Sequence, residues 1–370
     1  LMEARGAERI VQAIEGLVGR ARAPLAFLGA GFLLGIPMFA EAVFYLLLPL
    51  AKASWRETRR HGVLLVLSIV AGATMTHSLV PPTPGPLLVA DTMKIDIGLM
   101  MRQGMIVGAI AALAGFAYAR HADSRYEIPL RTADDDRTGS QPGSTLPPLW
   151  AALLPILLPV ILISADSAVD SIPNVPPAIV SLIHVVGDKY LALTVSAGAA
   201  ILLLATRPGA SREDVRAAVA GAVVEGGEII LVIAAGGALG ATLRQAGMAQ
   251  LAAAAVPGHA LLLLPIAWGV TALMRTAQGS ATVAMITAVG IVAPIVDASV
   301  LPYHGVYVAL AIGCGSKPGM WMNDSGFWVI ARMTGMTETE TLKTASVMVA
   351  IEGTVGLLAT MALAAVWPHP

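Results

Sequence analysis

Long apolar stretches alternate with short charged stretches along this sequence. Roughly 20 apolar residues let a helix cross the ~30 Å hydrocarbon core of a bilayer, and eight stretches approach that length. Backbone N–H and C=O groups inside lipid must be satisfied within the segment, so the pattern predicts α-helices. We expect an all-α polytopic membrane protein, with spans at residues 62–80, 97–119, 148–164, 190–206, 217–243, 258–274, 300–316 and 345–367.

A further apolar segment, residues 23–50, is interrupted midway by Gly35 and Pro37. Each half would form about 20 Å of helix, which is too short to cross the membrane. Basic residues flank both ends, Arg22 before and Arg60 after, and the positive-inside rule places both ends in the cytoplasm. The pattern favours a re-entrant hairpin and leaves open one tilted span that is kinked at the proline.

Two other apolar regions, 275–296 and 313–328, contain polar breaks. Interrupted segments in corresponding places of two halves mark the substrate sites of transporters. A weak similarity between residues 1–8 and 243–250 supports such a duplication. The prediction is a two-repeat transporter with re-entrant or broken hairpin helices. Its parts are a first repeat at 1–119, a hydrophilic loop at 120–147 and a second repeat at 148–370.

The composition narrows the class of protein further. Hydrophobic residues make up 56% of the 370 residues and charged residues only 13%, so the chain cannot cover the surface of soluble domains. The formal net charge of −1 gives no sign of a nucleic-acid partner. The single cysteine, Cys314, excludes an intramolecular disulfide and a cysteine-based metal cluster. A phosphate-binding loop of the Walker type is absent from the sequence, so it gives no sign of ATP hydrolysis. We expect the protein not to be an enzyme and to bind no cofactor.

Several motifs resemble those of the GntP family of gluconate:proton symporters, which belongs to the ion-transporter superfamily. The resemblance covers residues 1 to about 360, and its motifs lie at residues 77–86 (HSLVPPTPGP), 236–247 (GGALGATLRQAG), 275–285 (RTAQGSATVAM), 322–328 (MNDSGFW) and 341–348 (TLKTASVM). It implies proton-coupled uptake of gluconate or a related sugar acid, glycerate or D-serine across the bacterial cytoplasmic membrane. Thr83 stands where the family usually has a second histidine, which puts gluconate itself in question. Family members have membrane segments upstream of Leu1, so the resemblance implies an N-terminal truncation.

Two polar runs, residues 278–282 and residues 323–325, are candidates for binding an anionic hydroxy-acid. Near the first, a half-helix beginning at Gly279 would point a partial positive charge at a carboxylate. Close packing of small residues is the alternative explanation for that run, and N-capping of a helix is the alternative for the second. The predicted substrate-binding residues are Gln278, Gly279, Ser280, Thr282, Asn323, Ser325 and Thr83.

Three ionisable side chains inside apolar segments are candidates for proton coupling. Asp324 lies in the second polar run, Glu41 follows the break at Pro37, and His77 precedes the proline-rich motif. Intramembrane ionisable residues are costly and usually functional, although capping or structural hydrogen bonds would also explain them. Glu352 lies deeper in the last span and receives no role.

Alternative functions on the same sequence are a sodium-coupled carboxylate symporter, a channel and an intramembrane enzyme. Carbonyl groups near Gly279 or Asn323 could coordinate sodium, whereas no nucleophile and base are placed together for catalysis. The expected partners are therefore a small anionic hydroxy-acid, protons and the lipid bilayer. The sequence leaves the oligomeric state open, including a homo-oligomer.

Overall fold

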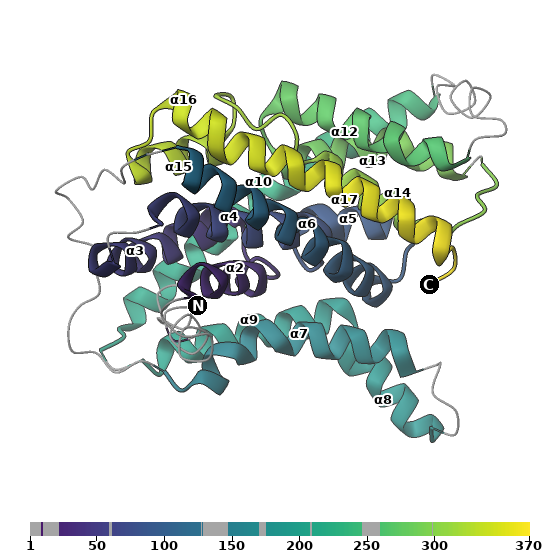
Figure 1. Cartoon of the computed structure of the whole chain (residues 1–370). Coiled ribbons are helices and arrows are strands. Elements are labelled where there is room, and N and C mark those ends of the chain that lie inside the picture. Colours follow the sequence, from purple (N-terminus) through teal and green to yellow (C-terminus); the bar gives the residue numbers. More distant parts are fainter. Residues whose placement is uncertain are drawn as a thin grey trace.

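The computed structural model describes residues 22–58, 61–126, 147–169, 175–207, 209–245, 260–297 and 299–370, together with Arg9 and Ile128. Within these residues the chain forms helices and no strands (Figure 1). Each of the eight predicted spans overlaps a helix within the described residues. By length and composition, three described helical stretches can cross a membrane: Gly62–Thr92, Ile97–Arg125 and Glu338–Val366. The all-α polytopic class is thus confirmed.

The first hairpin is made by α2 (Ala23–Leu34) and α3 (Ala40–Thr58), which precede α4 (Gly62–Leu79). Glycines let α2 approach the backbone of α4. A Cβ on Gly31 would lie 2.7 Å from the Ile69 carbonyl oxygen, and one on Gly35 would lie 2.8 Å from that of Ala73. Later residues of α2 meet later residues of α4, so the two helices run parallel.

Helix α3 runs in the opposite direction along α4. Its first residues lie at the far end of α4, where the Phe39 ring is 5.3 Å from the His77 ring. Its last residue, Thr58, is only three residues from the start of α4. The chain therefore reverses at residues 35–39, which favours the hairpin over a kinked span. With 12 residues α2 is about 18 Å long, shorter than a bilayer core.

Helix α4 ends at a proline-rich break. Pro81, Pro82 and Pro84 lack backbone N–H donors, and the next helix, α5 (Pro84–Thr92), begins after Thr83. The buried Thr83 hydroxyl oxygen lies 2.7 Å from the carbonyl oxygen of His77 and 3.0 Å from that of Val80, and its proton can be donated to either. This side chain therefore fastens the break to the end of α4.

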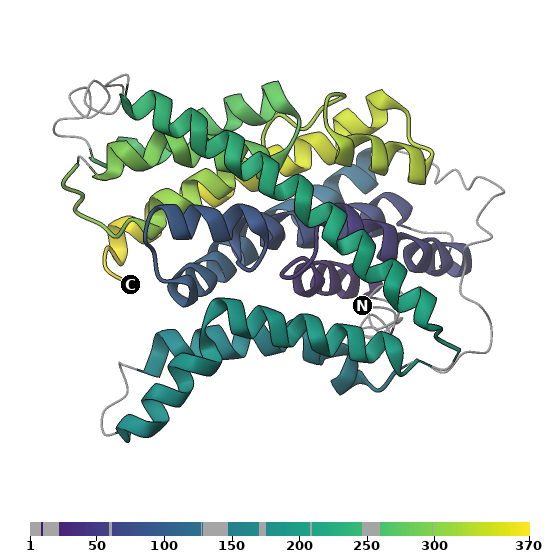
Figure 2. The same cartoon turned by 180° about the vertical axis from the view of Figure 1, so that it is seen from behind.

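The helices that lie between the two hairpin regions in the sequence form a second layer of the structure. The long helix α6 (Ile97–Arg125) leads to α7 (Leu149–Val169), α8 (Pro177–Gly187) and α9 (Lys189–Ala205), which lie together beneath the other helices (Figure 1). Seen from behind, α10 (Arg212–Gln245) runs obliquely from this layer to the opposite side (Figure 2). Large apolar side chains such as Trp150 and Leu182 are exposed here, as expected of a surface that faces lipid.

The helix order of the first hairpin region recurs after α10. A 3₁₀ turn, η2 (Ala260–Leu262), leads into α12 (Leu263–Gln278) and α13 (Ala281–Asp297), and α14 (Val306–Gly315) and α15 (Ser325–Thr334) flank a break. A continuous helical stretch follows: α16 (Glu338–Thr341), the π-helix η3 (Leu342–Ser346) and α17 (Val347–Val366). Helix α14 is shorter than the predicted span 300–316, because Pro302 and Gly305 precede its start.

The two regions are displaced along the chain by a nearly constant distance. Helices α2, α5 and α6 begin at residues 23, 84 and 97, and α12, α15 and α16 begin 240, 241 and 241 residues later. The similarity between residues 1–8 and 243–250 lies almost wholly outside the described residues. The repeat boundaries at 119 and 148 stay a prediction.

Glycines also join the two regions at their centre. A Cβ on Gly313 of α14 would lie 2.6 Å from the carbonyl oxygen of Ser78 in α4. A Cβ on Gly315 would lie 2.8 Å from Thr271 Cβ in α12. Backbone contacts of this kind thus connect α2, α4, α14 and α12 in succession.

Candidate functional site

A cavity of about 730 Å³ lies where the two hairpins and the two broken helices meet. Three helices begin at its wall: α3 with Ala40, α13 with Ala281 and α15 with Ser325. The first N–H groups of a helix have no partner within it, and the helix dipole adds a partial positive charge there. The cavity therefore offers three helix N-termini to a negatively charged group.

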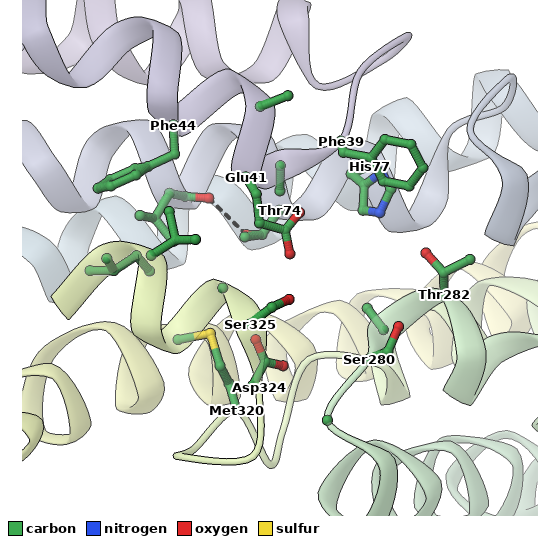
Figure 3. A pocket seen from close by; sticks show the side chains of 18 of the residues that line it. Phe39, Glu41, Phe44, Thr74, His77, Ser280, Thr282, Met320, Asp324 and Ser325 are labelled. Carbon is green, nitrogen blue, oxygen red and sulfur yellow. Dashed lines mark hydrogen bonds between the residues drawn. The ribbon is translucent and has the colours of Figure 1, made fainter. Parts of the chain in front are cut away.

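Hydroxyl and charged side chains surround the same space (Figure 3). The Glu41 carboxylate and the Ser325 hydroxyl point toward one another from opposite walls, while Ser280 and Thr282 point in from the start of α13. Apolar residues line another part of the cavity: Phe44, Tyr45, Val70, Met320, Val329 and Ile330. The site can bind a small molecule that is polar at one end.

The tip of the second hairpin is held tightly against the 316–324 break. Gly279 ends α12 with a φ of 74°, a left-handed conformation that favours glycine. A Cβ here would collide with the Asn323 carbonyl oxygen. The Thr276 carbonyl oxygen accepts hydrogen bonds from Asn323 Nδ2, at 2.7 Å, and Trp321 Nε1, at 3.0 Å.

An ion pair between Arg275 and Asp324 forms part of the cavity wall. The two side chains are 10% and 1% exposed, so each charge depends on the other for compensation. Asp324 also caps α15 by accepting a hydrogen bond from the Phe327 N–H at 3.2 Å. The N-capping predicted as an alternative for this residue is therefore present, alongside its place in the cavity.

The structure brings most of the predicted site residues together, although they come from distant parts of the chain. The predicted residues that line the cavity are Gly279, Ser280, Thr282, Ser325, Asp324, Glu41 and His77. Gln278, Asn323 and Thr83 do not line it. Gln278 is exposed, and the other two make the hydrogen bonds to Thr276 and His77 described above. Whether any of these residues binds substrate or exchanges a proton stays a prediction.

Sequence reasoning missed Lys317 and Thr74 and gave Arg275 no specific role. Lys317 is buried, lines the cavity and donates from Nζ to the Thr74 carbonyl oxygen at 2.6 Å. A lone lysine in the glycine-rich stretch 313–320 was the available signal, because a charge at membrane depth needs a reason to be there. Across the part of the chain that the structure describes, no group of three or more His, Cys, Asp and Glu residues could hold a metal ion.

Half-helices that point their N-termini at a polar cavity within an apolar bundle are typical of secondary transporters. The family model for GntP family permeases matches residues 1–366, and the chain belongs to this family. It is 33% identical over 351 residues to the low-affinity gluconate transporter of Escherichia coli K12, covering 93% of this chain and 77% of that protein. It is 31% identical over 370 residues to a gluconate permease of Zymomonas mobilis, covering 99% and 82%. A third relative is the inner membrane permease YgbN of Escherichia coli K12. It is 29% identical over 378 residues, which cover 98% of this chain and 82% of that protein.

These relationships confirm that the chain is a multi-pass permease of the bacterial inner membrane and not an enzyme.

Proposed function

We propose that the protein is a symporter that takes up a sugar acid or a related small hydroxy-acid together with protons. The convergence of three helix N-termini on one cavity carries this proposal. An anionic carboxylate is stabilised by such N-termini and by the nearby cations Arg275 and Lys317. The hydroxyls of Ser280, Thr282 and Ser325 line the same cavity, which supports their role as hydrogen-bond partners of the substrate hydroxyl groups.

The names of the relatives support a sugar acid as substrate, since two of them are gluconate transporters. The apolar part of the wall and the threonine at position 83 argue for testing shorter acids beside gluconate. Glycerate and D-serine combine one carboxylate with few polar groups, so the polar end of the cavity suits them. The substrate-binding role of Gln278 and Asn323 would require a rearrangement of the tip of the second hairpin.

Coupling to protons requires a group that gains and loses a proton as the site faces each side. Asp324, Glu41 and His77, the three predicted coupling residues, all line the cavity and are therefore candidates for exchanging a proton with it. A bound substrate carboxylate favours the protonated form of a nearby acidic side chain, because two negative charges close together repel each other. This coupling between substrate binding and protonation is what symport requires.

The recurring helix order supports a two-repeat architecture with a modified boundary. The first unit runs from α2 to α6 and the second from α12 to α17, residues 263–366. Helices α7 to α10 lie between the two units in the sequence. We therefore place the second repeat nearer residue 260 than residue 148.

Transport by purified protein in proteoliposomes tests the function. The vesicles are loaded with unlabelled gluconate, glycerate or D-serine, and entry of the labelled acid is followed. We expect saturable counterflow of at least one acid, and accumulation when the outside is made acidic that an uncoupler abolishes. Accumulation that needs a sodium gradient and ignores the uncoupler would instead show sodium coupling.

A further inference from the structure

A carboxyl group lies one residue behind the cavity wall. Glu352 of α17 is fully buried and does not line the cavity. Its Oε2 lies 3.0 Å from the hydroxyl oxygen of Thr74, which does line the cavity. Gly115 of α6 leaves room for this carboxyl, because a Cβ there would lie 2.8 Å from Glu352 Cγ. Thr74 therefore separates Glu352 from the substrate space.

Lys317 contacts the same threonine from the cavity side. Its Nζ donates to the Thr74 carbonyl oxygen at 2.6 Å, and its side chain is only 4% exposed. The residue after Glu352 packs on it, since a Cβ on Gly353 would lie 2.8 Å from Lys317 Cβ. Lys317 and Glu352 are therefore linked through Thr74, which contacts Lys317 with its carbonyl oxygen and Glu352 with its hydroxyl.

The hydrogen bonds of Thr74 suit a protonated Glu352. The hydroxyl oxygen lies 2.8 Å from the Val70 carbonyl oxygen and 3.0 Å from Glu352 Oε2, but a hydroxyl has a single proton to donate. With a carboxylate, one of the two acceptors is left without that proton. A neutral Glu352 can donate to the Thr74 oxygen while Thr74 donates to Val70, so both bonds form.

The other charges around this cluster leave Lys317 as the natural counterion of Glu352. Arg275 of α12 is paired with Asp324, and Glu41 of α3 lines the same cavity as Lys317. The remaining titratable neighbours are the Cys314 thiol of α14 and His77 of α4. A proton on Glu352 therefore releases positive charge on Lys317 at the cavity wall, where an anion can use it.

We propose that Glu352 carries the transported proton and that Lys317 links its charge to binding of the substrate carboxylate. The inference rests on the proposed proton-coupled uptake. Thr74 relays the proton: its oxygen accepts one from a hydronium ion in the cavity, which leaves a water molecule, while its own proton passes to Glu352 Oε2, and release is the reverse. Protonation of Glu352 strengthens anion binding at Lys317, and bound anion favours protonation by the same factor.

The test uses gluconate binding and proteoliposome transport by the full chain. Wild-type affinity should fall as pH rises, by up to about tenfold per pH unit where Glu352 titrates. Glu352→Gln imitates the protonated form, so its affinity should stay high and independent of pH. It should keep counterflow at equal pH but lose accumulation driven by a pH gradient. Lys317→Met should lose binding at every pH.

Exposed residues on the same helical stretch provide matched controls. Glu338→Gln, Lys343→Met and Thr354→Val change the same chemistry away from the cluster and should behave like wild type. Thr74→Val keeps the shape of the relay residue without its hydroxyl and should slow pH-driven uptake at least tenfold. If Glu352→Gln does not elute as folded protein on size exclusion, pH-driven uptake by Thr74→Val decides whether the proton passes through Thr74 to Glu352.

Each result separates the inference from the proposed function. Failure of wild type to exchange gluconate, glycerate or D-serine overturns both. Normal wild-type symport, with pH-driven accumulation retained in folded Glu352→Gln and Thr74→Val, overturns only the role of Glu352. Loss of that accumulation in Asp324→Asn alone would assign the proton to Asp324 instead.

Discussion

Replacing Asp324 with asparagine removes its charge while keeping a good helix cap. The carboxylate compensates Arg275 inside the protein, where the two side chains are 1% and 10% exposed. Removing one partner of a buried ion pair costs ~3–5 kcal/mol because the other charge is left uncompensated. Asparagine caps helices about as well as aspartate, so the hydrogen bond to Phe327 N–H should survive and contribute little to the loss.

A double-mutant cycle isolates the ion pair from other effects of the substitution. Arg275→Met alone should also destabilise the protein by ~3–5 kcal/mol, because Asp324 then keeps a buried charge without its partner. The double variant Arg275→Met with Asp324→Asn should be more stable than either single variant. Non-additivity of this kind is expected for residues in contact.

Thermal unfolding in detergent, followed by size exclusion of the surviving fraction, measures the effect. Each single variant should lose about 5 °C or more in apparent Tm, and the double variant should recover part of that loss. The control substitution Glu213→Gln, at an exposed position at the start of α10, should leave Tm within about 1 °C of wild type. Equal Tm values for wild type and Asp324→Asn, or a double variant that is merely the sum of the singles, would refute a stabilising buried pair.

Three further predictions follow from the hairpins and the cavity. Gly279→Ala should lose ~1–2 kcal/mol of stability from its left-handed φ alone, and more because the new Cβ collides with Asn323. A lower Tm and lost counterflow would show this, whereas unchanged values would contradict the tight turn. Ser280→Ala should weaken sugar-acid binding by roughly 1–3 kcal/mol if a substrate hydroxyl loses its partner, and calorimetric titration that finds equal affinity would move the site elsewhere. Cysteines placed at Arg22 and Arg60 should both react with a membrane-impermeant reagent from the cytoplasmic side only, since a labelled periplasmic site would exclude the re-entrant hairpin.

Local sequence signals were sufficient for most helix boundaries. Gly35 and Pro37 interrupt an apolar segment, and the structure breaks the helix between Leu34 and Ala40. Helix α3 nevertheless continues past the end of this segment at residue 50 to Thr58, through a charged stretch that contains Lys52 and Arg56. Lysine and arginine favour helices, so charge indicates contact with water without predicting where a helix ends.

The arrangement of the site was only partly predictable. Each of Glu41, His77 and Asp324 carries a local signal, an ionisable group in apolar surroundings, so each could be selected singly. Their meeting at one cavity depends on packing between helices far apart in the chain. The hydrogen bond between Thr74 and Glu352 joins residues 278 positions apart, which a one-dimensional pattern does not report.

The succession of glycine contacts through α2, α4, α14 and α12 has a mechanical consequence. Where one backbone rests on another, no side chain can change rotamer to let the helices slide. The four helices should consequently shift as one rigid body, and α4 and α12 carry their part of the cavity wall with them. The α7 layer packs on this body through α6, where no glycine contact of this kind is found among the described residues. A bound anion would then travel with that part of the wall throughout its passage.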